Sequence, residues 1–350
     1  MSQNLTAPTI VSLHSVNSLY DKTWTAEEVL ALSRGYQGSA VLAAAADLDL
    51  FTALRAGPAN AQTVADSINC DLRGVAVLLD SLASLQLLEK SGNNYRLAPG
   101  VENVLLEGGP QTVLAMVQHQ ANCMRRWGQL AKVVKTGHPA ERVTSVRGEA
   151  GDQASFIGAM DNISAPQADQ VIQALKPLSF NRLLDVGGAS GTWTGAFLRA
   201  CPSGRAILFD LPVVIPMADQ RLTRLGQRDR VELVSGDFMV DPLPLGADLA
   251  WVSAIVHQNS RSQNRQLFAS VFHALVPRGR IVIRDILMDA TRTLPVAGAL
   301  FAINMLVATE GGGTFTFEEL AEDLSAAGFV ETTVVRQDEG MSSLVAARKP

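Results

Sequence analysis

The chain has 350 residues, 47% of them hydrophobic, and a formal net charge of −5. The hydrophobic content excludes a disordered protein, and the length predicts two folded parts. Lys and Arg are not gathered into runs, which argues against nucleic acid as the main partner.

The lack of a recognisable targeting signal and the spacing of the cysteines predict a cytoplasmic protein. The N-terminus is polar and has no basic region followed by an apolar core, so no signal peptide is predicted. The longest apolar patch, residues 40–50, is too short to span a bilayer, so no membrane partner is expected. Cys70, Cys123 and Cys201 are far apart and lack metal-ligand spacing. Free thiols of this kind fit a reducing cytoplasm.

The first hundred residues predict a helical region that ends in a winged helix. Residues 1–24 lack strong periodicity and form either a loose arm or part of a dimer contact, whereas residues 25–54 are helical in pattern. Two helices over 61–85 and a hairpin over 87–98 give the winged-helix layout. A DNA reader needs positive charge on the second helix, and this one carries little beyond Arg73, which favours a structural role.

The middle of the chain predicts more helices. Residues 113–136 form one helical stretch, which Gly137-His138-Pro139 interrupts. We expect a loop over 149–153, and then a helix that begins near Phe156 and continues towards Leu175.

From Phe180 onward, strands and helices alternate, which predicts a parallel sheet covered on both faces. A helix from Phe317 that ends at Gly328 precedes two final strands, so one antiparallel edge is expected. The seven expected strands are Arg182–Val186, Ala206–Asp210, Val231–Ser235, Leu249–Ser253, Arg280–Asp285, Phe329–Arg336 and Ser343–Arg348.

The most informative stretch is Arg182–Thr192, where an apolar strand ends in Asp185 and a glycine-rich turn follows at once. Such a turn brings backbone N–H groups close to a cofactor. The next strand ends in Asp210, 25 residues after Asp185, where a carboxylate meets a ribose. The spacing is Gly-Gly-x-x-Gly instead of the dinucleotide pattern Gly-x-Gly-x-x-Gly. Gly236-Asp237-Phe238 follows the third strand, where a carboxylate could accept from an adenine amine.

These motifs resemble those of class I S-adenosylmethionine (SAM) methyltransferases of the plant-type small-molecule O-methyltransferase family, which has bacterial members. The resemblance covers nearly the whole chain. It implies a winged-helix dimerisation domain (1–105), a helical linker and substrate cap (106–178) and a Rossmann-like SAM-binding domain (179–350) with a seven-stranded, mostly parallel sheet. It also implies a homodimer through the N-terminal domain.

The resemblance implies specific residues for SAM and for catalysis. The family's first SAM motif matches Asp185–Gly191, with Ala189 at its third glycine. His257 stands at the position of the family's general base, although Gln258 and Asn259 replace the acid and tryptophan that follow it. Asp285 matches the acid that orients the base, and Thr314 replaces a second acid. The expected SAM-binding residues are Asp185, Gly187, Gly188, Gly191, Asp210, Leu211, Asp237, Phe238 and Ser253.

Six further residues match the regions that line the family's acceptor pocket: Trp127, Phe156, Met160, Asn162, Asn304 and Met305. Structural alternatives remain for many of the chosen residues. The pocket residues could be core, since Met and aromatic side chains at helical spacing often are. His257 could merely satisfy backbone groups, Asp237 could cap a turn, and Asp185 could hold the glycine turn without touching a ligand.

The expected activity is methyl transfer from SAM to a small molecule, with a hydroxyl of an aromatic or secondary metabolite as the leading acceptor. Nitrogen or carbon acceptors stay open because Gln258 and Thr314 depart from the family pattern. A SAM-fold protein that has lost methyl transfer, and a winged-helix regulator gated by a small ligand, are the alternatives from other classes. No metal is expected, because His119, His138, His257 and His273 show no ligand pattern.

Overall fold

The computed structural model describes residues 22–350. Its N-terminal part has the expected helices and hairpin, and strands β1, β3 and β2 pair antiparallel in that order. Local capping defines the helices: Thr25 and Glu28 form a capping box on the first, and Asp71 accepts from the Gly74 N–H at the start of the fifth. The elements are α1 (Ala26–Arg34), α2 (Tyr36–Asp47), α3 (Leu50–Ala53), β1 (Ala59–Asn60), α4 (Ala61–Ser67), α5 (Leu72–Ser84), β2 (Leu88–Ser91) and β3 (Asn94–Leu97).

The linker is helical, and it departs from the prediction over residues 149–153. These residues lie in the first turns of a helix instead of a loop, and the Asp152 carboxylate accepts from the Ser145 N–H at 2.9 Å just before that helix. The helix ends near Pro166, which has no N–H to continue it, so two helices replace the single one expected towards Leu175. The elements are α6 (Val101–Leu105), α7 (Leu114–Trp127), α8 (Leu130–Thr136), α9 (Gly148–Ser164) and α10 (Ala168–Gln173).

The C-terminal part contains the expected seven-stranded, mostly parallel sheet. Its strand order is β11-β12-β8-β7-β4-β5-β6, and β12 runs antiparallel to both β8 and β11. The strands are β4 (Arg182–Val186), β5 (Arg205–Asp210), β6 (Val231–Ser235), β7 (Ala247–Ser253), β8 (Leu275–Asp285), β11 (Val330–Arg336) and β12 (Ser343–Arg348). The helices are α11 (Thr192–Ala200), α12 (Ile215–Arg224), η2 (Arg228–Arg230), η3 (Val256–Gln258), α13 (Arg261–Ala274), α14 (Val296–Ala308) and α15 (Phe317–Ala326). A separate pair, β9 (Leu287–Met288) and β10 (Phe315–Thr316), is parallel.

Two hydrophobic cores cover the two faces of this sheet. Neighbouring residues of β4 alternate between them: Leu184 packs with Phe268 of α13, whereas Leu183 packs with Phe197 of α11. Strands buried on both faces need continuous apolar runs, which is why the sequence predicted them well. No helix within residues 22–350 is long and apolar enough to cross a membrane.

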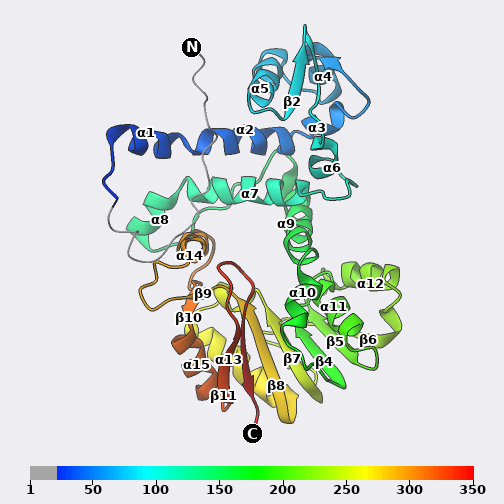
Figure 1. Ribbon diagram of the computed structural model, residues 1–350, viewed down its shortest axis with the longest axis vertical. Coiled ribbons are helices and arrows are strands. Elements are labelled where there is room, and N and C mark those ends of the chain that lie inside the picture. The colour runs from blue at the N-terminus through cyan, green and yellow to red at the C-terminus, as the bar shows by residue number, and fades with distance from the viewer. Residues whose placement is uncertain (1–21) are drawn as a thin grey trace.

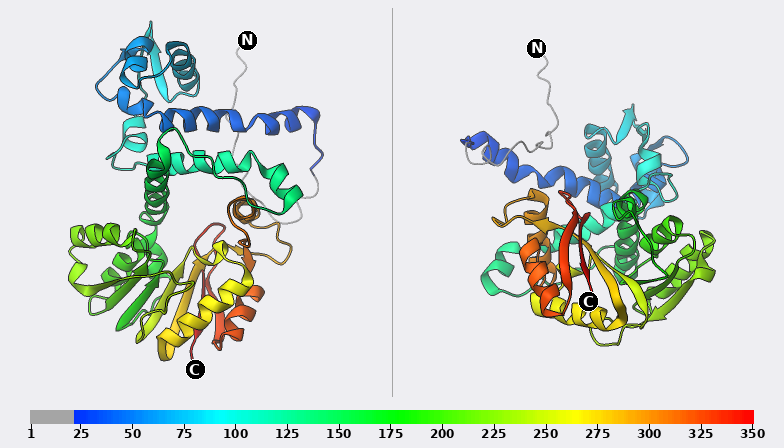
Figure 2. Two further views of the ribbon diagram at one scale, coloured as in Figure 1. Left: turned by 180° about the vertical axis from the view of Figure 1, so that it is seen from behind. Right: turned by 60° about the horizontal axis from the view of Figure 1, so that its bottom comes forward.

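The arrangement of the parts places the carboxyl ends of the central strands below the linker helices. Figure 1 shows α2 and α7 running alongside each other above the sheet, and α9 descending from α7 towards it. The views in Figure 2 show the same order from behind and from below. In open α/β sheets, ligands bind at the carboxyl ends of the strands, where the order of connections reverses. Here that point lies between β4 and β7.

Candidate active site

The glycine turn after β4 has a backbone that only small residues allow. Gly187 and Gly191 have φ values of +68° and +78°, in the left-handed region that favours glycine. At Gly188, an added Cβ would lie 2.6 Å from Cγ of Leu208 on β5. Ala189 also has a positive φ of +47°, so it keeps the turn conformation that the family's glycine would have. The glycine turn ends at Gly191, and α11 begins at the next residue, Thr192.

Asp210 fastens this turn to the end of β5. One carboxylate oxygen accepts from the Ala189 N–H at 2.7 Å, and the other accepts from the Leu211 N–H at 2.7 Å. Burial raises the pKa of Asp210 above its ordinary value. Each carboxylate oxygen has more than one lone pair, so the group can still accept from the hydroxyls of a ribose. Leu211 beside it is largely exposed, at 44%.

Asp185 lies beneath the turn, and its exposure is only 1%. Its carboxylate accepts from the Thr194 hydroxyl at 2.5 Å, which joins β4 to α11. Burial, together with the nearby charge of Asp210, raises the pKa of Asp185 to about 7. This contact fits the structural alternative, in which Asp185 holds the turn; its contact with a cofactor stays a prediction.

The remaining expected cofactor residues lie at the ends of β6 and β7. Asp237 is half-buried and accepts from the Met239 N–H at 2.9 Å, so it also stabilises its own turn. Phe238 packs against the core and lies beside the Gly187 position. The Ser253 hydroxyl accepts from Arg284 Nη1 at 3.1 Å. Their roles in cofactor binding stay predictions.

His257 and Asp285 come together at the ends of β7 and β8. Nδ1 of His257 lies 2.9 Å from each carboxylate oxygen of Asp285, and both side chains are buried. Asp285 also accepts from the backbone N–H of Ile286 at 2.8 Å, which fixes its orientation. A carboxylate can only accept, so Nδ1 carries a proton, and in the neutral imidazole Nε2 is then the nitrogen with the lone pair. This arrangement can remove a proton from a group placed at Nε2.

Two features around His257 were missed from the sequence. Phe301 of α14 meets the imidazole edge to face, with ring centroids 4.9 Å apart. The Gly313 N–H donates to the His257 carbonyl at 2.9 Å, and a Cβ on Gly312 would lie 2.5 Å from that same oxygen. The glycine run after α14 was visible in the sequence, but its contact with the histidine was not.

Three of the four positions that depart from the family pattern lie near this pair. Gln258 is exposed, and its amide donates to the Ala254 carbonyl at 3.0 Å. Asn259 is buried and donates to Asn264 of α13 at 3.1 Å. Thr314 is buried, and its carbonyl accepts from Arg292. Asp285 is therefore the carboxylate that orients His257 within the described chain.

The expected acceptor residues are distributed over α7, α9 and α14. Trp127 Nε1 donates to Asn304 Oδ1 at 3.1 Å, which joins α7 to α14. Asn162 donates to the Thr112 carbonyl at 2.8 Å and accepts from the Met116 N–H, so backbone groups already occupy its amide. Three other side chains differ in burial: Phe156 is exposed and stacks edge-on against His119, Met160 is half-buried and Met305 is buried. Their contacts with an acceptor stay predictions.

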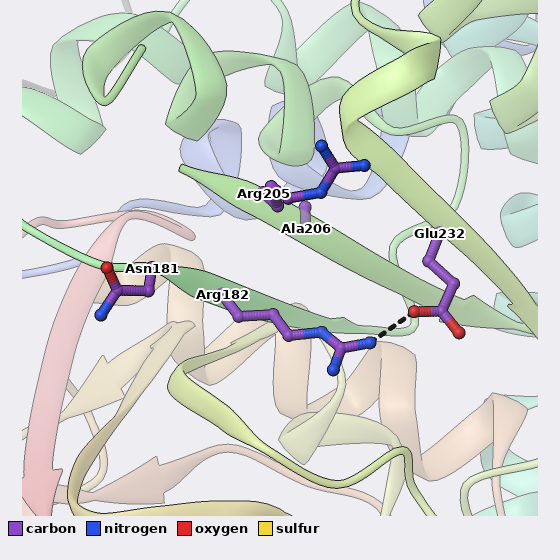
Figure 3. A pocket seen from close by; sticks show the side chains of 5 residues that line it. All are labelled: Asn181, Arg182, Arg205, Ala206 and Glu232. Carbon is purple, nitrogen blue, oxygen red and sulfur yellow. Dashed lines mark hydrogen bonds and ion pairs between the residues drawn. The ribbon is translucent and has the colours of Figure 1, made fainter. Parts of the chain in front are cut away.

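A hollow at the opposite edge of the sheet is not part of this site. Figure 3 shows its lining by Asn181, Arg182, Arg205, Ala206 and Glu232, at the amino ends of β4, β5 and β6. Arg182 and Glu232 form an ion pair across it. Parallel strands place their carboxyl ends, and hence Asp210 and His257, at the other edge of the sheet.

The cofactor residues fit a nucleoside group on structural grounds. The left-handed glycines, the Gly188 position that a Cβ would fill and the Asp210 carboxylate are the parts that such a site requires. Within residues 22–350, no group of three or more His, Cys, Asp or Glu residues is arranged to hold a metal ion. The expectation that the protein needs no metal stays a prediction.

Comparison with known proteins gives two family matches. Residues 127–330 match an O-methyltransferase domain, and residues 30–103 match an O-methyltransferase dimerisation domain. The tetracenomycin polyketide synthesis 8-O-methyl transferase of Streptomyces glaucescens is 32% identical over 333 residues, covering 92% of this chain and 96% of the relative. An N,N-dimethyltransferase, OxyT of Streptomyces rimosus, is 28% identical and covers 91% and 94%. Human N-acetylserotonin methyltransferase in complex with SAM has a TM-score of 0.78 at 27% identity, covering 94% and 99%.

Proposed function

Since the chain belongs to the family of SAM-dependent O-methyltransferases, we propose that it methylates a hydroxyl oxygen of a small aromatic acceptor, with His257 as the base. The His257–Asp285 pair is the observation that supports the proposal. Its cofactor is SAM, which supplies an electrophilic methyl group when bound. The relatives that methylate hydroxyl groups include a 3-hydroxy-5-methyl-1-naphthoate 3-O-methyltransferase of Streptomyces sahachiroi, 31% identical over 91% of this chain.

Different parts of the chain would hold the cofactor and activate the acceptor. Asp210 would accept from the ribose hydroxyls, the turn at 187–191 would lie against the cofactor, and Asp237 with Phe238 would contact the adenine. A phenol with a pKa of about 10 must lose its proton near pH 7 for its oxygen to attack. Nε2 of His257 would take that proton, and Asp285 would stabilise the positive charge that the imidazole gains.

Replacing the base tests this proposal. His257→Ala should lower kcat with a hydroxynaphthoate acceptor by roughly 10²–10⁴-fold, while calorimetry should give nearly unchanged affinity for SAM. Gln258→Ala is the matched control, because this neighbour is exposed and points its amide at the Ala254 carbonyl. Unchanged turnover in His257→Ala would remove His257 as the base. SAM binding without transfer to any acceptor would favour the alternative in which methyl transfer has been lost.

An amine acceptor is the second candidate, and the similarity to OxyT favours it. The lone pair of a neutral amine is nucleophilic enough to attack without prior loss of a proton, whereas a phenol reacts well only as its phenolate. Transfer to nitrogen therefore depends less on a base before attack. His257→Ala should then cost far less in turnover with an aromatic amine than with a hydroxynaphthoate. Transfer of a labelled methyl group from SAM to two acceptors that differ only in carrying a hydroxyl or an amine distinguishes the O-methyltransferase from the N-methyltransferase.

We also propose that the protein works as a homodimer in the cytoplasm. The dimerisation-domain match and a row of exposed apolar side chains on and beside α1, among them Val29, Leu30 and Leu32, support a homodimer. The free cysteines Cys70, Cys123 and Cys201 suit a reducing compartment. Light scattering at micromolar concentration should give the mass of a dimer, and Leu32→Glu should shift it towards a monomer. A monomeric wild-type protein would contradict the proposal.

A further inference from the structure

Asp161 of α9 has partners on two different helices of the sheet domain. Its Oδ1 accepts from the Thr192 hydroxyl at 2.7 Å, and its Oδ2 pairs with Arg221 Nη1 at 2.6 Å. Thr192 is the first residue of α11 and directly follows the glycine turn. Arg221 lies on α12, which follows Asp210 after a short loop. One carboxylate of the linker thus holds the two helices that begin after the two expected cofactor loops.

The surroundings of this contact make it stronger than an ordinary surface ion pair. The side chains of Asp161 and Arg221 are 30% and 22% exposed, and Thr192 is buried. Both bonds involve a charged group, and such bonds are shorter and stronger than neutral ones. All three residues lie within helices. A displacement of one of them therefore moves its whole helix, because no flexible loop lies between the contact and the helix.

The same helix carries expected acceptor residues. Met160 and Asn162 flank Asp161 in the sequence, and Phe156 lies more than one turn earlier on α9. The helix also packs closely against α7, which carries Trp127. Asp161 therefore forms a direct contact between the helix that carries the expected acceptor residues and Thr192, the residue that follows the glycine turn expected to hold the cofactor.

We infer that Asp161 is a positioning residue that couples cofactor binding to the order of α9. The inference rests on the cofactor site proposed above. When a ligand fixes the turn at 187–191, Thr192 is fixed with it, and the Thr192–Asp161–Arg221 contacts extend that order to the acceptor helix. By linkage, an acceptor that fixes α9 tightens cofactor binding by the same factor.

Amide hydrogen exchange of the full chain, with and without S-adenosylhomocysteine, tests the coupling. In the wild-type protein, this ligand should slow exchange both in the turn at 187–191 and in α9. Thr192→Val removes the donor at similar size, and it should cut the ligand-induced protection of α9 by roughly tenfold or more while the turn stays protected. Thr192→Ser is the matched control, because it keeps the hydroxyl and should behave as wild type.

A second substitution and a kinetic measurement separate coupling from simple loss of stability. Arg221→Met leaves the Thr192 bond in place and removes the ion pair, so it should lose part of the α9 protection. Thr192→Val should raise the KM for a hydroxynaphthoate acceptor several-fold while kcat changes little, and Thr192→Ser should restore it.

The outcomes distinguish failure of this inference from failure of the proposed function. Calorimetry that gives no binding of S-adenosylhomocysteine to folded protein overturns both. Binding that protects the turn but leaves α9 unchanged in the wild-type protein overturns only the coupling. Full α9 protection in both Thr192→Val and Arg221→Met does the same, because the coupling would then not pass through Asp161.

Discussion

Both carboxylate oxygens of Asp285 lie 2.9 Å from Nδ1 of His257. The pair is buried, and within residues 22–350 Asp285 supplies the carboxylate that contacts the imidazole. The orientation of the imidazole, and with it of the proposed base, should therefore depend on Asp285.

Replacing that carboxylate should therefore impair turnover strongly. Asp285→Asn presents an amide to Nδ1, which favours the wrong imidazole tautomer and removes the charge that stabilises the protonated ring. We expect kcat with a hydroxynaphthoate acceptor to fall by roughly 10²–10⁴-fold, with SAM affinity from calorimetry within a few-fold of wild type. Thr314→Val is the control and should change kcat little. Equal turnover of Asp285→Asn and wild type would show that the ring is oriented by other groups.

Cofactor affinity should depend on Asp210. Asp210→Asn removes the charge and turns one of its two acceptors into a donor that faces a backbone N–H, at Ala189 or at Leu211. The dissociation constant of S-adenosylhomocysteine, measured by calorimetry, should rise at least tenfold, because a bond to a charged group contributes roughly 1.5–3 kcal/mol. Asp219→Asn is a suitable control, since this acid lies on α12 and pairs with Arg228 at the surface. A similar loss of S-adenosylhomocysteine affinity in Asp210→Asn and Asp219→Asn would indicate a general effect of charge and not a contact made by Asp210.

The pH dependence of stability should reveal the buried Asp185. Its pKa of about 7 in the folded protein exceeds the ordinary value of 3.8, so the folded state binds more protons between these values. The contribution of Asp185 to the free energy of unfolding therefore falls as pH rises from about 4 to about 7. Asp185→Asn keeps an acceptor for Thr194 and removes this titration.

Urea unfolding at pH 5 and pH 8 measures this effect. Wild type should lose more stability between the two pH values than Asp185→Asn does. Asp66→Asn, at an exposed position on α4, should keep the wild-type difference. The same pH dependence in Asp185→Asn and wild type would show that this carboxyl does not titrate in that range.

The glycine turn contains a residue whose replacement should stabilise the fold. Ala189 has a φ of +47°, and left-handed backbone costs an L-residue roughly 1–2 kcal/mol. Ala189→Gly removes that cost, offset in part by the greater freedom of glycine in the unfolded chain. We expect the free energy of unfolding to rise by about 0.5–1 kcal/mol.

A control at an ordinary helical position makes the sign of this effect decisive. Ala131 is exposed on α8, so Ala131→Gly should lower the free energy of unfolding by about 0.5–1 kcal/mol. If both substitutions destabilise by the same amount in urea unfolding, the positive φ at Ala189 is not a source of strain.

Errors in the sequence-based prediction lie where local pattern competes with distant contacts. Residues 149–153 are rich in polar and small residues and suggested a loop, yet they form the first turns of α9. The Ser145–Asp152 bond joins residues only seven positions apart. The packing of α9 against α7, by contrast, depends on a partner that no local window contains. Asp161 went unnoticed for the same reason: its partners lie 31 and 60 positions further along the chain.

The sequence by itself determined the order of the strands along the chain, the glycine turn, and the carboxylates that follow β4 and β5. These features have local causes, because buried strands need apolar runs and a left-handed turn needs small residues. The resemblance pointed to Asp285 as the partner of His257. Only the tertiary structure decided the geometry of that pair, and only it decided that Asp161 joins α9 to both α11 and α12. Such contacts depend on the pairing of β7 with β8 and on the docking of α9, which no short stretch of sequence encodes.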